Sequence, residues 1–406
     1  MSPIVPRIAR RFAILGSGLI RPRVSIDACA RARLDLIRWA AAIGVLMTHI
    51  RSTMFVPFPD VSNKSVAARV FYAATGIGHL AVMVFFVLSG YLVGGRLLAR
   101  YCSGNASIPR YLLDRFTRLY IVLIPALLIT ALFDRIGVGA FNANGVYSHS
   151  SVPEVPGIKY SILERLDLRH LLSNLCMLQQ TLTPTYGSNA PLWSLANEFW
   201  YYLALPCLIV AADRTQRGSR RVSCLLALLA MVWALEGEIL TYALVWGTGV
   251  GVAFLPRVPL RHIWVALLGF GAVALVSRAF DAAISRMGGA RLAVDLTCAL
   301  AFAAVLAAVV HRQGSTPVGR AAAIHERLAG VSYSAYAMHA PLLTLAVAAL
   351  YDEFGIGLHM QPNAQGLLVY AAVLLGVAIV VGVLGGILEP RTEAVRGWLK
   401  RLLHVH

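Results

Sequence analysis

Charged side chains are scarce in this sequence of 406 residues. They make up 14% of the chain, and its 19 aspartates and glutamates are outnumbered by 36 lysines and arginines. Soluble globular domains carry about 25% charged residues. Here 58% of the residues are hydrophobic, and the mean hydropathy is +0.70. This balance excludes an ordinary soluble domain and predicts an all-α polytopic membrane protein.

Cysteine is also sparse, and we find no internal repeat, low-complexity tract or cleavable signal sequence. The six cysteines have no closely paired spacing. This argues against a disulfide framework or a zinc site, and we expect no metal. The N-terminal arm is interrupted by arginines and lacks a long apolar core before Leu34. We therefore expect the arm to stay attached.

Ten apolar stretches approach the length that a membrane helix needs, about 20 residues, and predict about ten transmembrane helices around a polar central cavity. Two of them, 222–237 and 239–255, are short and almost continuous, so they form either a tight hairpin or one long kinked segment. The ten stretches are 34–50, 74–98, 118–138, 192–212, 222–237, 239–255, 262–279, 293–311, 330–351 and 365–388.

Basic residues gather in alternate connections between these stretches. Because lysine and arginine accumulate in cytoplasmic loops, we expect both termini in the cytoplasm. The net charge of +17 then indicates topology and contact with anionic membrane lipids, and we expect no nucleic-acid binding. The predicted parts are a basic arm at 1–33, a membrane domain at 34–390 and a basic tail at 391–406. The basic connections are the arm, 96–118, 213–221, 256–262, 312–327 and the tail.

The first apolar stretch, LDLIRWAAAIGVLMTHI at 34–50, contains three ionisable residues. At 100° per residue, Arg38 and His49 fall on one helix face about 16 Å apart along the axis. Asp35 lies one turn before Arg38, so the two side chains are expected to pair. His49 lacks such a local partner.

The fourth stretch contains PLWSLANEFWYYL, in which Glu198 lies about two turns from the outer end. This depth is similar to that of His49, so a carboxylate–imidazole pair is expected. Ser194 lies one turn earlier on the same face. Trp193 and Tyr202 belong either to the cavity or to an interfacial aromatic belt.

Three other stretches carry candidate polar groups. Ser89 lies among glycines that suit either close helix packing or a cavity wall. Arg115 and Arg118, one turn apart at the cytoplasmic membrane edge, either bind phosphates or only follow the distribution of positive charge. In VSYSAYAMHAP at 331–341, polar residues on one helix stripe indicate a lumen, and they are Ser332, Tyr336 and His339.

Together these stretches resemble the acyltransferase family 3 membrane proteins, the family of O-antigen, exopolysaccharide and nodulation-factor O-acetyltransferases. The sequence departs from the family pattern around Glu198, at Ala196, Asn197 and Trp200, and it lacks the acidic residue that many members have before FFVLSG. Six motifs occur in the family's order: Arg38 and His49 with ten residues between them, FFVLSGYL at 85–92, DRFTRLY at 114–120, PLWSLANEFWYY at 191–202, VSYSAYAMHAP at 331–341 and LEP at 388–390.

The resemblance implies transfer of an acyl group, usually acetyl, from cytoplasmic acyl-CoA to a sugar hydroxyl on a glycan that is built at or exported across a bacterial inner membrane. Arg38, Arg115 and Arg118 would hold the anionic donor. His49 would be the general base, with Glu198 orienting its ring. Candidates for substrate binding or for the oxyanion donor are Ser89, Trp193, Ser194, Tyr202, Tyr333, Tyr336 and His339.

Two alternatives stay open at this point. If Glu198 lies beyond hydrogen-bond reach of His49, the histidine works alone or with Tyr336 or His339. The competing class of protein is a transporter that exports a glycan or lipid without bond chemistry. A transporter needs no base aligned with a phosphate-binding arginine, so the pair of Arg38 and His49 favours the enzyme.

Overall fold

The structure is a computed structural model that describes residues 22, 24, 26–149, 155, 157–235, 237–256, 262–279, 290–311, 319 and 321–403. This part of the chain is largely helical and contains no strand, so the expected all-α class is confirmed. Most of the N-terminal arm and much of the basic connections 256–262 and 312–327, which entered the prediction of orientation, lie outside the described residues.

Within the described residues, seven helical stretches are long and apolar enough to cross a membrane, which confirms a polytopic membrane protein. Each overlaps one of the ten stretches expected from the sequence. They are Val66–Cys102, Ile108–Ala140, Ala190–Ala212, His262–Ala279, Arg291–Val310, Ala321–Phe354 and Ala364–Leu402.

The other three expected spans are also helical: α2 (Ala28–Met54), α9 (Gly218–Ala234) and α10 (Gly237–Val252). The latter two have 17 and 16 residues, which at 1.5 Å per residue is short of the hydrocarbon core of about 30 Å. Helix α9 lies along α8 (Trp193–Ala212), whereas α10 packs against α4 (Gly78–Ser89). The region 222–255 is therefore two separate helices, and the single kinked segment is not formed.

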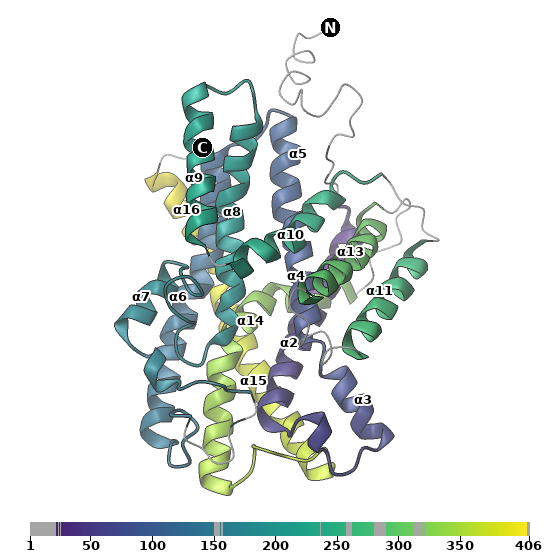
Figure 1. Cartoon of the computed structure of the whole chain (residues 1–406), viewed down its shortest axis with the longest axis vertical. Coiled ribbons are helices and arrows are strands. Elements are labelled where there is room, and N and C mark those ends of the chain that lie inside the picture. Colours follow the sequence, from purple (N-terminus) through teal and green to yellow (C-terminus); the bar gives the residue numbers. More distant parts are fainter. Residues whose placement is uncertain are drawn as a thin grey trace.

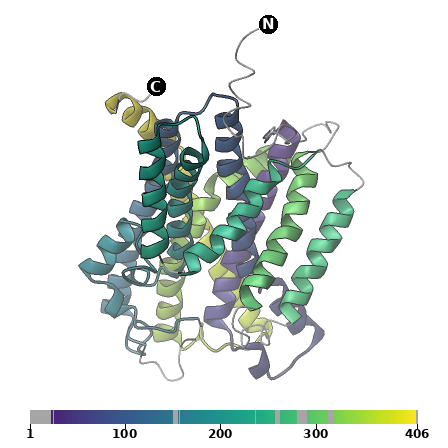
Figure 2. The same cartoon turned by 45° about the horizontal axis from the view of Figure 1, so that its top comes forward.

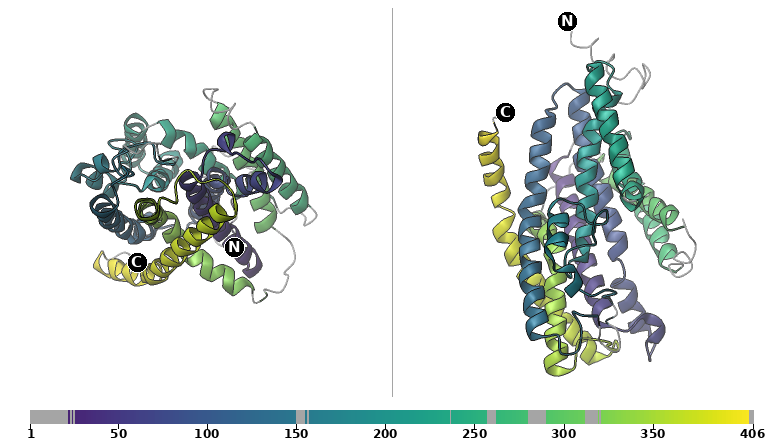
Figure 3. Two further views of the ribbon diagram at one scale, coloured as in Figure 1. Left: turned by 90° about the horizontal axis from the view of Figure 1, so that it is seen from below. Right: turned by 60° about the vertical axis from the view of Figure 1, so that its left-hand side comes forward.

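Helix α14 (Ala321–Phe354) lies at the centre of the bundle (Figures 1 and 2). It packs against α2, α6 (Ile108–Ala140) and α15 (Ala364–Leu388). By contrast, none of the described residues of α9 or of α11 (His262–Ala279) is buried. These two helices lie at the edge of the bundle (Figure 3), where apolar side chains would face lipid.

A π-helical segment, η2 (Gly90–Gly95), continues α4 and leads into α5 (Arg96–Cys102). Gly90 and Gly249 make close backbone contacts here: a Cβ on Gly90 would collide with the Trp246 carbonyl, and a Cβ on Gly249 with the Val87 carbonyl. Glycine thus lets α10 approach the end of α4. The approach brings the Trp246 indole N–H to within 3.2 Å of the Ser89 hydroxyl. Irregular turns of this kind are frequent at functional sites.

The long segment 157–192 is fixed to the bundle near its C-terminal end. The buried Asp134 carboxylate accepts hydrogen bonds from the backbone N–H and the hydroxyl of Ser188, both at 2.7 Å. The Asn189 side-chain amide donates to the Ala337 carbonyl of α14 at 2.9 Å. Three short helices lie in this segment: η3 (Leu163–Arg165), α7 (Leu168–Leu175) and η4 (Ala190–Leu192).

Hydrogen bonds and ion pairs between connections define two opposite sides of the bundle. One group joins the connections around α3 (Val66–Ala74), α7, the α9–α10 turn and the end of α14, and we call it the α3 side. The other joins the end of α5, the start of α6, the end of α8 and α16 (Arg391–Leu402), and we call it the α5 side (Figure 1). The bonds are Ser62–Gln361, Asn144–Asp352 and Gln180–Glu238 on the first side, and Tyr101–Asp213, Asp114–Arg396 and Arg118–Glu389 on the second.

Candidate functional site

A cavity of about 930 Å³ extends into the bundle among α2, α4, α5, α6, α8 and α14 from the α5 side. Most of the site residues predicted from the sequence line it, and they come from five separate motifs. They are Arg38, Ser89, Arg115, Arg118, Ser194, Glu198, Tyr202, Tyr333 and Tyr336. Of the described residues in the wall, eight are arginines and four are carboxylates. We call this the basic cavity.

Five of these arginines were not singled out in the sequence. They come from the N-terminal end of α2, from α5, from the start of α6 and from α16, and they are Arg31, Arg96, Arg100, Arg110 and Arg396. The available signal was the density of basic residues in the expected cytoplasmic connections. That density alone does not separate a binding surface from the usual distribution of charge.

Ion pairs hold several charged groups of the basic cavity in place. Arg38 lies 3.5 Å from Asp35, as predicted from their spacing of one turn. Arg118 lies 3.2 Å from Glu389 and over the Tyr333 ring at 5.6 Å. Arginine combines both contacts because its planar guanidinium pairs with a carboxylate and stacks on an aromatic face.

Glu389 is a further positioning residue that the sequence analysis did not single out, although it lies in LEP. Its buried carboxylate accepts hydrogen bonds from the backbone N–H and the hydroxyl of Ser334, at 3.1 and 3.0 Å. Together with its ion pair to Arg118, these bonds join three motifs distant in the sequence. Removing Glu389 would leave Arg118 without this partner.

Glu198 lies deeper in the basic cavity, on α8. Its carboxylate accepts a hydrogen bond from the Tyr202 hydroxyl at 2.9 Å, one turn further along the same helix. The Tyr202 hydroxyl is also 3.0 Å from the Ser89 hydroxyl. Arg115 and Arg118 line the same cavity. The Glu198 side chain therefore lies among polar and basic groups.

The inner wall of the basic cavity contains Ser194 and Tyr336. The Ser194 hydroxyl donates to the Tyr336 hydroxyl at 2.8 Å, and the Tyr336 hydroxyl donates to the Pro191 carbonyl at 3.1 Å. The Tyr336 ring lies next to His339, with 6.2 Å between the ring centres. Tyr336 therefore stands between the basic cavity and a pair of histidines.

His49 and His339 form this pair. Their rings are stacked with centres 4.9 Å apart, and His49 Nδ1 lies 2.6 Å from His339 Nε2. His339 Nδ1 lies 3.0 Å from the Ala335 carbonyl, which only accepts, so this nitrogen carries the proton. In a neutral pair His339 Nε2 is then an acceptor, and His49 Nδ1 donates to it. The lone pair of His49 is left on Nε2, as a general base requires.

The expected pair of Glu198 and His49 is not formed. Among the described residues, the Glu198 carboxylate accepts a hydrogen bond from Tyr202, and the His49 ring is hydrogen-bonded to His339. Similar depth in the membrane did not determine which way each side chain points around its helix. His339, a residue of the ninth stretch, provides the orienting contact instead.

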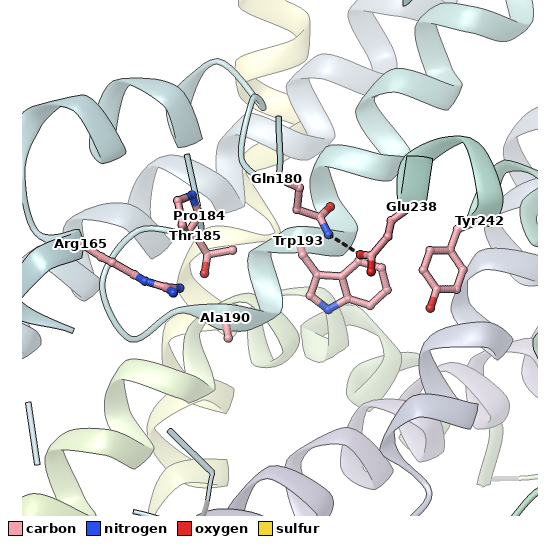
Figure 4. A pocket seen from close by; sticks show the side chains of 8 residues that line it. All are labelled: Arg165, Gln180, Pro184, Thr185, Ala190, Trp193, Glu238 and Tyr242. Atoms are coloured by element: carbon pink, nitrogen blue, oxygen red, sulfur yellow. Dashed lines mark hydrogen bonds between the residues drawn. The ribbon is translucent and has the colours of Figure 1, made fainter. Parts of the chain in front are cut away.

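A second pocket, of about 310 Å³, lies on the other side of this wall and is shown in Figure 4. Trp193 lines it, whereas its neighbour Ser194 lines the basic cavity. We call it the aromatic pocket.

Among the described residues, no group of three or more histidine, cysteine or acidic side chains is arranged to hold a metal ion.

Comparisons with known proteins give one family and one relative. Residues 31–386 match the family described as "Acyltransferase domain". The chain is 30% identical over 170 residues to the acyltransferase MdmB of Streptomyces mycarofaciens, and the match covers 42% of this chain and 37% of that protein. The chain thus aligns with little more than a third of that relative's length. No solved structure matches the chain.

Proposed function

This chain belongs to acyltransferase family 3, and from that premise we propose that it transfers an acyl group, typically acetyl, from acyl-CoA to a sugar hydroxyl of an extracytoplasmic or lipid-linked glycan. The observation that carries the proposal is the basic cavity with Glu198, Ser194 and Tyr336 at its inner part. An arginine-rich entrance followed by uncharged hydroxyls suits a donor with phosphates at one end and a thioester at the other.

The arginines would bind the phosphates of acetyl-CoA as co-substrate. Arg115 and Arg118, one turn apart on α6, and Arg38 on α2 line the same cavity. Guanidinium groups form bidentate, charge-assisted hydrogen bonds with phosphate oxygens. With the phosphates held there, the narrow pantetheine arm would extend inward and place the thioester near Tyr336.

The proposed reaction uses His49 Nε2 as general base. It takes the proton of the acceptor hydroxyl while the hydroxyl oxygen attacks the thioester carbonyl. The new C–O bond forms as the C–S bond breaks, and the proton passes to the sulfur so that CoA leaves as the thiol. His339 acts as a positioning residue, because its hydrogen bond keeps the His49 lone pair on Nε2 and stabilises the cation formed.

Glu198 would act at the reacting end of the donor or on the acceptor hydroxyl, since it lies in the basic cavity and not against His49. Its hydrogen bond from Tyr202 fixes the carboxylate, and Ser89 fixes Tyr202 in turn. Ser89, Ser194 and Tyr336 remain our candidates for the oxyanion donor, because each places a hydroxyl in the wall of the cavity.

We place the α5 side in the cytoplasm of a bacterium and the protein in its inner membrane. Two observations support this orientation. The expected cytoplasmic connections are the basic ones. Among the described residues, bonds between connections join members predicted to lie on the same side, as for Arg118 with Glu389 and Gln180 with Glu238. The basic cavity would then face cytoplasmic acyl-CoA.

Release of CoA from acetyl-CoA tests the proposal. The full chain in lipid nanodiscs would be given radiolabelled acetyl-CoA with and without a cell-envelope glycan extract, and free thiol and labelled glycan would be measured. We expect glycan-dependent thiol release matched by label in the glycan. In sealed proteoliposomes that contain the chain, movement of the glycan across the membrane with no thiol release would show an exporter instead and overturn the proposal.

A further inference from the structure

The aromatic pocket has two walls of different chemistry (Figure 4). On one side, the rings of Trp193 and Tyr242 have centres 5.3 Å apart and planes inclined at 46°. Phe86 packs against both rings, at 5.8 and 5.7 Å, which holds this wall rigid. A pair of supported aromatic rings offers a ligand an apolar surface with little loss of side-chain entropy.

Polar side chains form the rest of the aromatic pocket. The Gln180 amide donates to Glu238 at 3.1 Å, which ties the long segment 157–192 to the start of α10. Arg165 lines the pocket while its guanidinium lies over the Tyr160 ring at 3.4 Å. These planar groups carry several donors and acceptors at fixed positions.

The charges of the aromatic pocket balance, unlike those of the basic cavity. Among its described lining residues, Arg165 is the cation and Glu238 the carboxylate. A polyanion such as acyl-CoA would gain little electrostatic binding energy in this pocket compared with remaining in water. An alkyl chain would leave the polar groups of the rim without partners. The pocket instead suits a small neutral ligand that has an apolar face and several hydroxyls.

The aromatic pocket lies directly behind the inner wall of the basic cavity. Trp193 and Ser194 are consecutive residues, and each lines a different one of the two spaces. Ala190 and Trp193 belong to the same short turn that receives the hydrogen bond from Tyr336 at Pro191. A ligand in the aromatic pocket would thus be one turn of backbone from the groups assigned to the thioester.

We propose that the aromatic pocket binds one pyranose ring of the acceptor glycan. This inference rests on the proposed function and gives the acceptor its own site. The C–H face of the ring would stack on Trp193 and Tyr242, and ring hydroxyls would bond to Gln180, Glu238 and Arg165. The volume of about 310 Å³ is at the lower end for small-molecule sites and suits a single sugar unit.

Saturation-transfer NMR with simple glycosides tests this assignment. The full chain in nanodiscs, free of glycoside detergents, would be mixed with the methyl glycosides of glucose, galactose, mannose and rhamnose, with mannitol as an open-chain control. We expect saturation of at least one pyranoside and none of mannitol. We also expect the saturation to be lost in Tyr242→Leu and reduced in Glu238→Gln, but retained in Tyr242→Phe, which keeps the ring.

Trp398→Leu is the matched control, because Trp398 is an aromatic residue on α16 that is 56% exposed and lies on the α5 side, whereas the Gln180–Glu238 bond of the pocket lies on the α3 side. It should bind the glycosides like the unaltered chain. Saturation that is equally strong in Tyr242→Leu, or absent for all four glycosides, would overturn the inference.

Kinetics separate this inference from the proposed function. In the thiol-release assay, Tyr242→Leu should raise the KM for the glycan extract about tenfold and leave the KM for acetyl-CoA unchanged. An unchanged glycan KM in an active enzyme would overturn the inference and leave the acyltransferase standing. Glycoside binding that depends on Tyr242, without any thiol release, would instead overturn the proposed function.

Discussion

The two spaces on either side of the Trp193–Ser194 peptide are built in different ways. The basic cavity is enclosed by long helices, and of its described lining residues eight are arginines and four are carboxylates. The aromatic pocket is formed by the segment 157–192 and the start of α10, and its charges balance. This difference is the basis of our proposal that two ligands of different charge approach from opposite sides, with the reacting groups at the wall between them.

Removing the base at this wall is the change with the largest expected effect. We expect His49→Ala to reduce acyl transfer by about two to four orders of magnitude, since general bases contribute that much to rate. Thiol release by nanodisc samples would measure it. Both ligands should still bind, because the groups proposed to hold them are the arginines of the basic cavity and the side chains of the aromatic pocket.

His262→Ala is the control for this experiment, because His262 is exposed at the start of α11. It should transfer at the normal rate. A loss of only a few-fold in well-folded His49→Ala would contradict the assignment of the base.

Removing the carboxylate of the basic cavity should have the next largest effect. Glu198→Gln keeps the shape and the hydrogen bond from Tyr202 but removes the charge. We expect transfer to fall about 100-fold while acetyl-CoA still binds, since electrostatic and acid–base groups at a reacting centre contribute on this scale. Single-turnover kinetics and calorimetry would separate the two properties. Normal turnover would reduce Glu198 to a structural role.

Replacing one arginine in each space by glutamine tests whether the basic cavity, and not the aromatic pocket, binds the anionic donor. Arg115→Gln should weaken acetyl-CoA binding about tenfold, since a charge-assisted hydrogen bond to phosphate is lost. Arg165→Gln in the aromatic pocket should leave acetyl-CoA affinity unchanged, as should Arg214→Gln on the exposed α8–α9 connection. Calorimetry measures all three. Equal affinities in all variants would mean that the arginines of the basic cavity determine topology only.

The smallest effect is expected outside both spaces, at Asp213 just beyond the end of α8. Burial raises the pKa of this carboxyl, but hydrogen bonds from Tyr101 at 2.5 Å and from Thr215 at 2.7 and 2.9 Å outweigh it, so the pKa is below its ordinary value. A lowered pKa in the folded state stabilises the protein above the ordinary aspartate pKa. This stabilisation is lost as the pH falls through the lowered pKa.

Asp213→Asn should therefore lower the unfolding temperature by about 2 °C at pH 7, and the difference should shrink below about pH 4. Thermal unfolding followed by tryptophan fluorescence would measure it, and acetyl-CoA affinity would serve as the readout for an intact basic cavity. A difference that persists unchanged in acid would show that the carboxylate charge is not what stabilises this corner.

The sequence predicted local geometry better than contacts between helices. The Asp35–Arg38 pair depends only on the spacing within one helix, and the structure confirms it. The polar stripe of α14 was also predicted, and Tyr336 lines the basic cavity while His339 contacts His49. The pairing of Glu198 with His49 needed the rotation of two helices that are not adjacent in the chain. Such rotations are set by packing, for example where Gly90 and Gly249 bring α10 close to α4.

The aromatic pocket could not be predicted from the sequence, because it too depends on contacts between segments that are distant in the chain. Trp193 was interpretable either as part of an interfacial belt or as a site residue, and the choice depends on Tyr242 and Gln180. These partners come from a helix and a long connection whose relative position no local pattern specifies. The sequence analysis included Glu389 only as part of the LEP motif. Its role as a positioning residue depends on its contacts with Arg118 and Ser334, which the sequence does not show.

The hydrogen bond from Asn189 to the Ala337 carbonyl also has a consequence for biosynthesis. The two residues are 148 positions apart, so a ribosome that adds 5 to 20 residues per second needs about 7 to 30 s between them. During this interval the turn that separates the two spaces has no α14 to close against. A chain truncated before α14 would keep the hydrogen bond from the Asn189 amide to the Thr130 hydroxyl at 3.0 Å but would leave the second amide N–H without its acceptor. An unsatisfied donor of this kind would distinguish an unfinished chain from a finished one in the membrane.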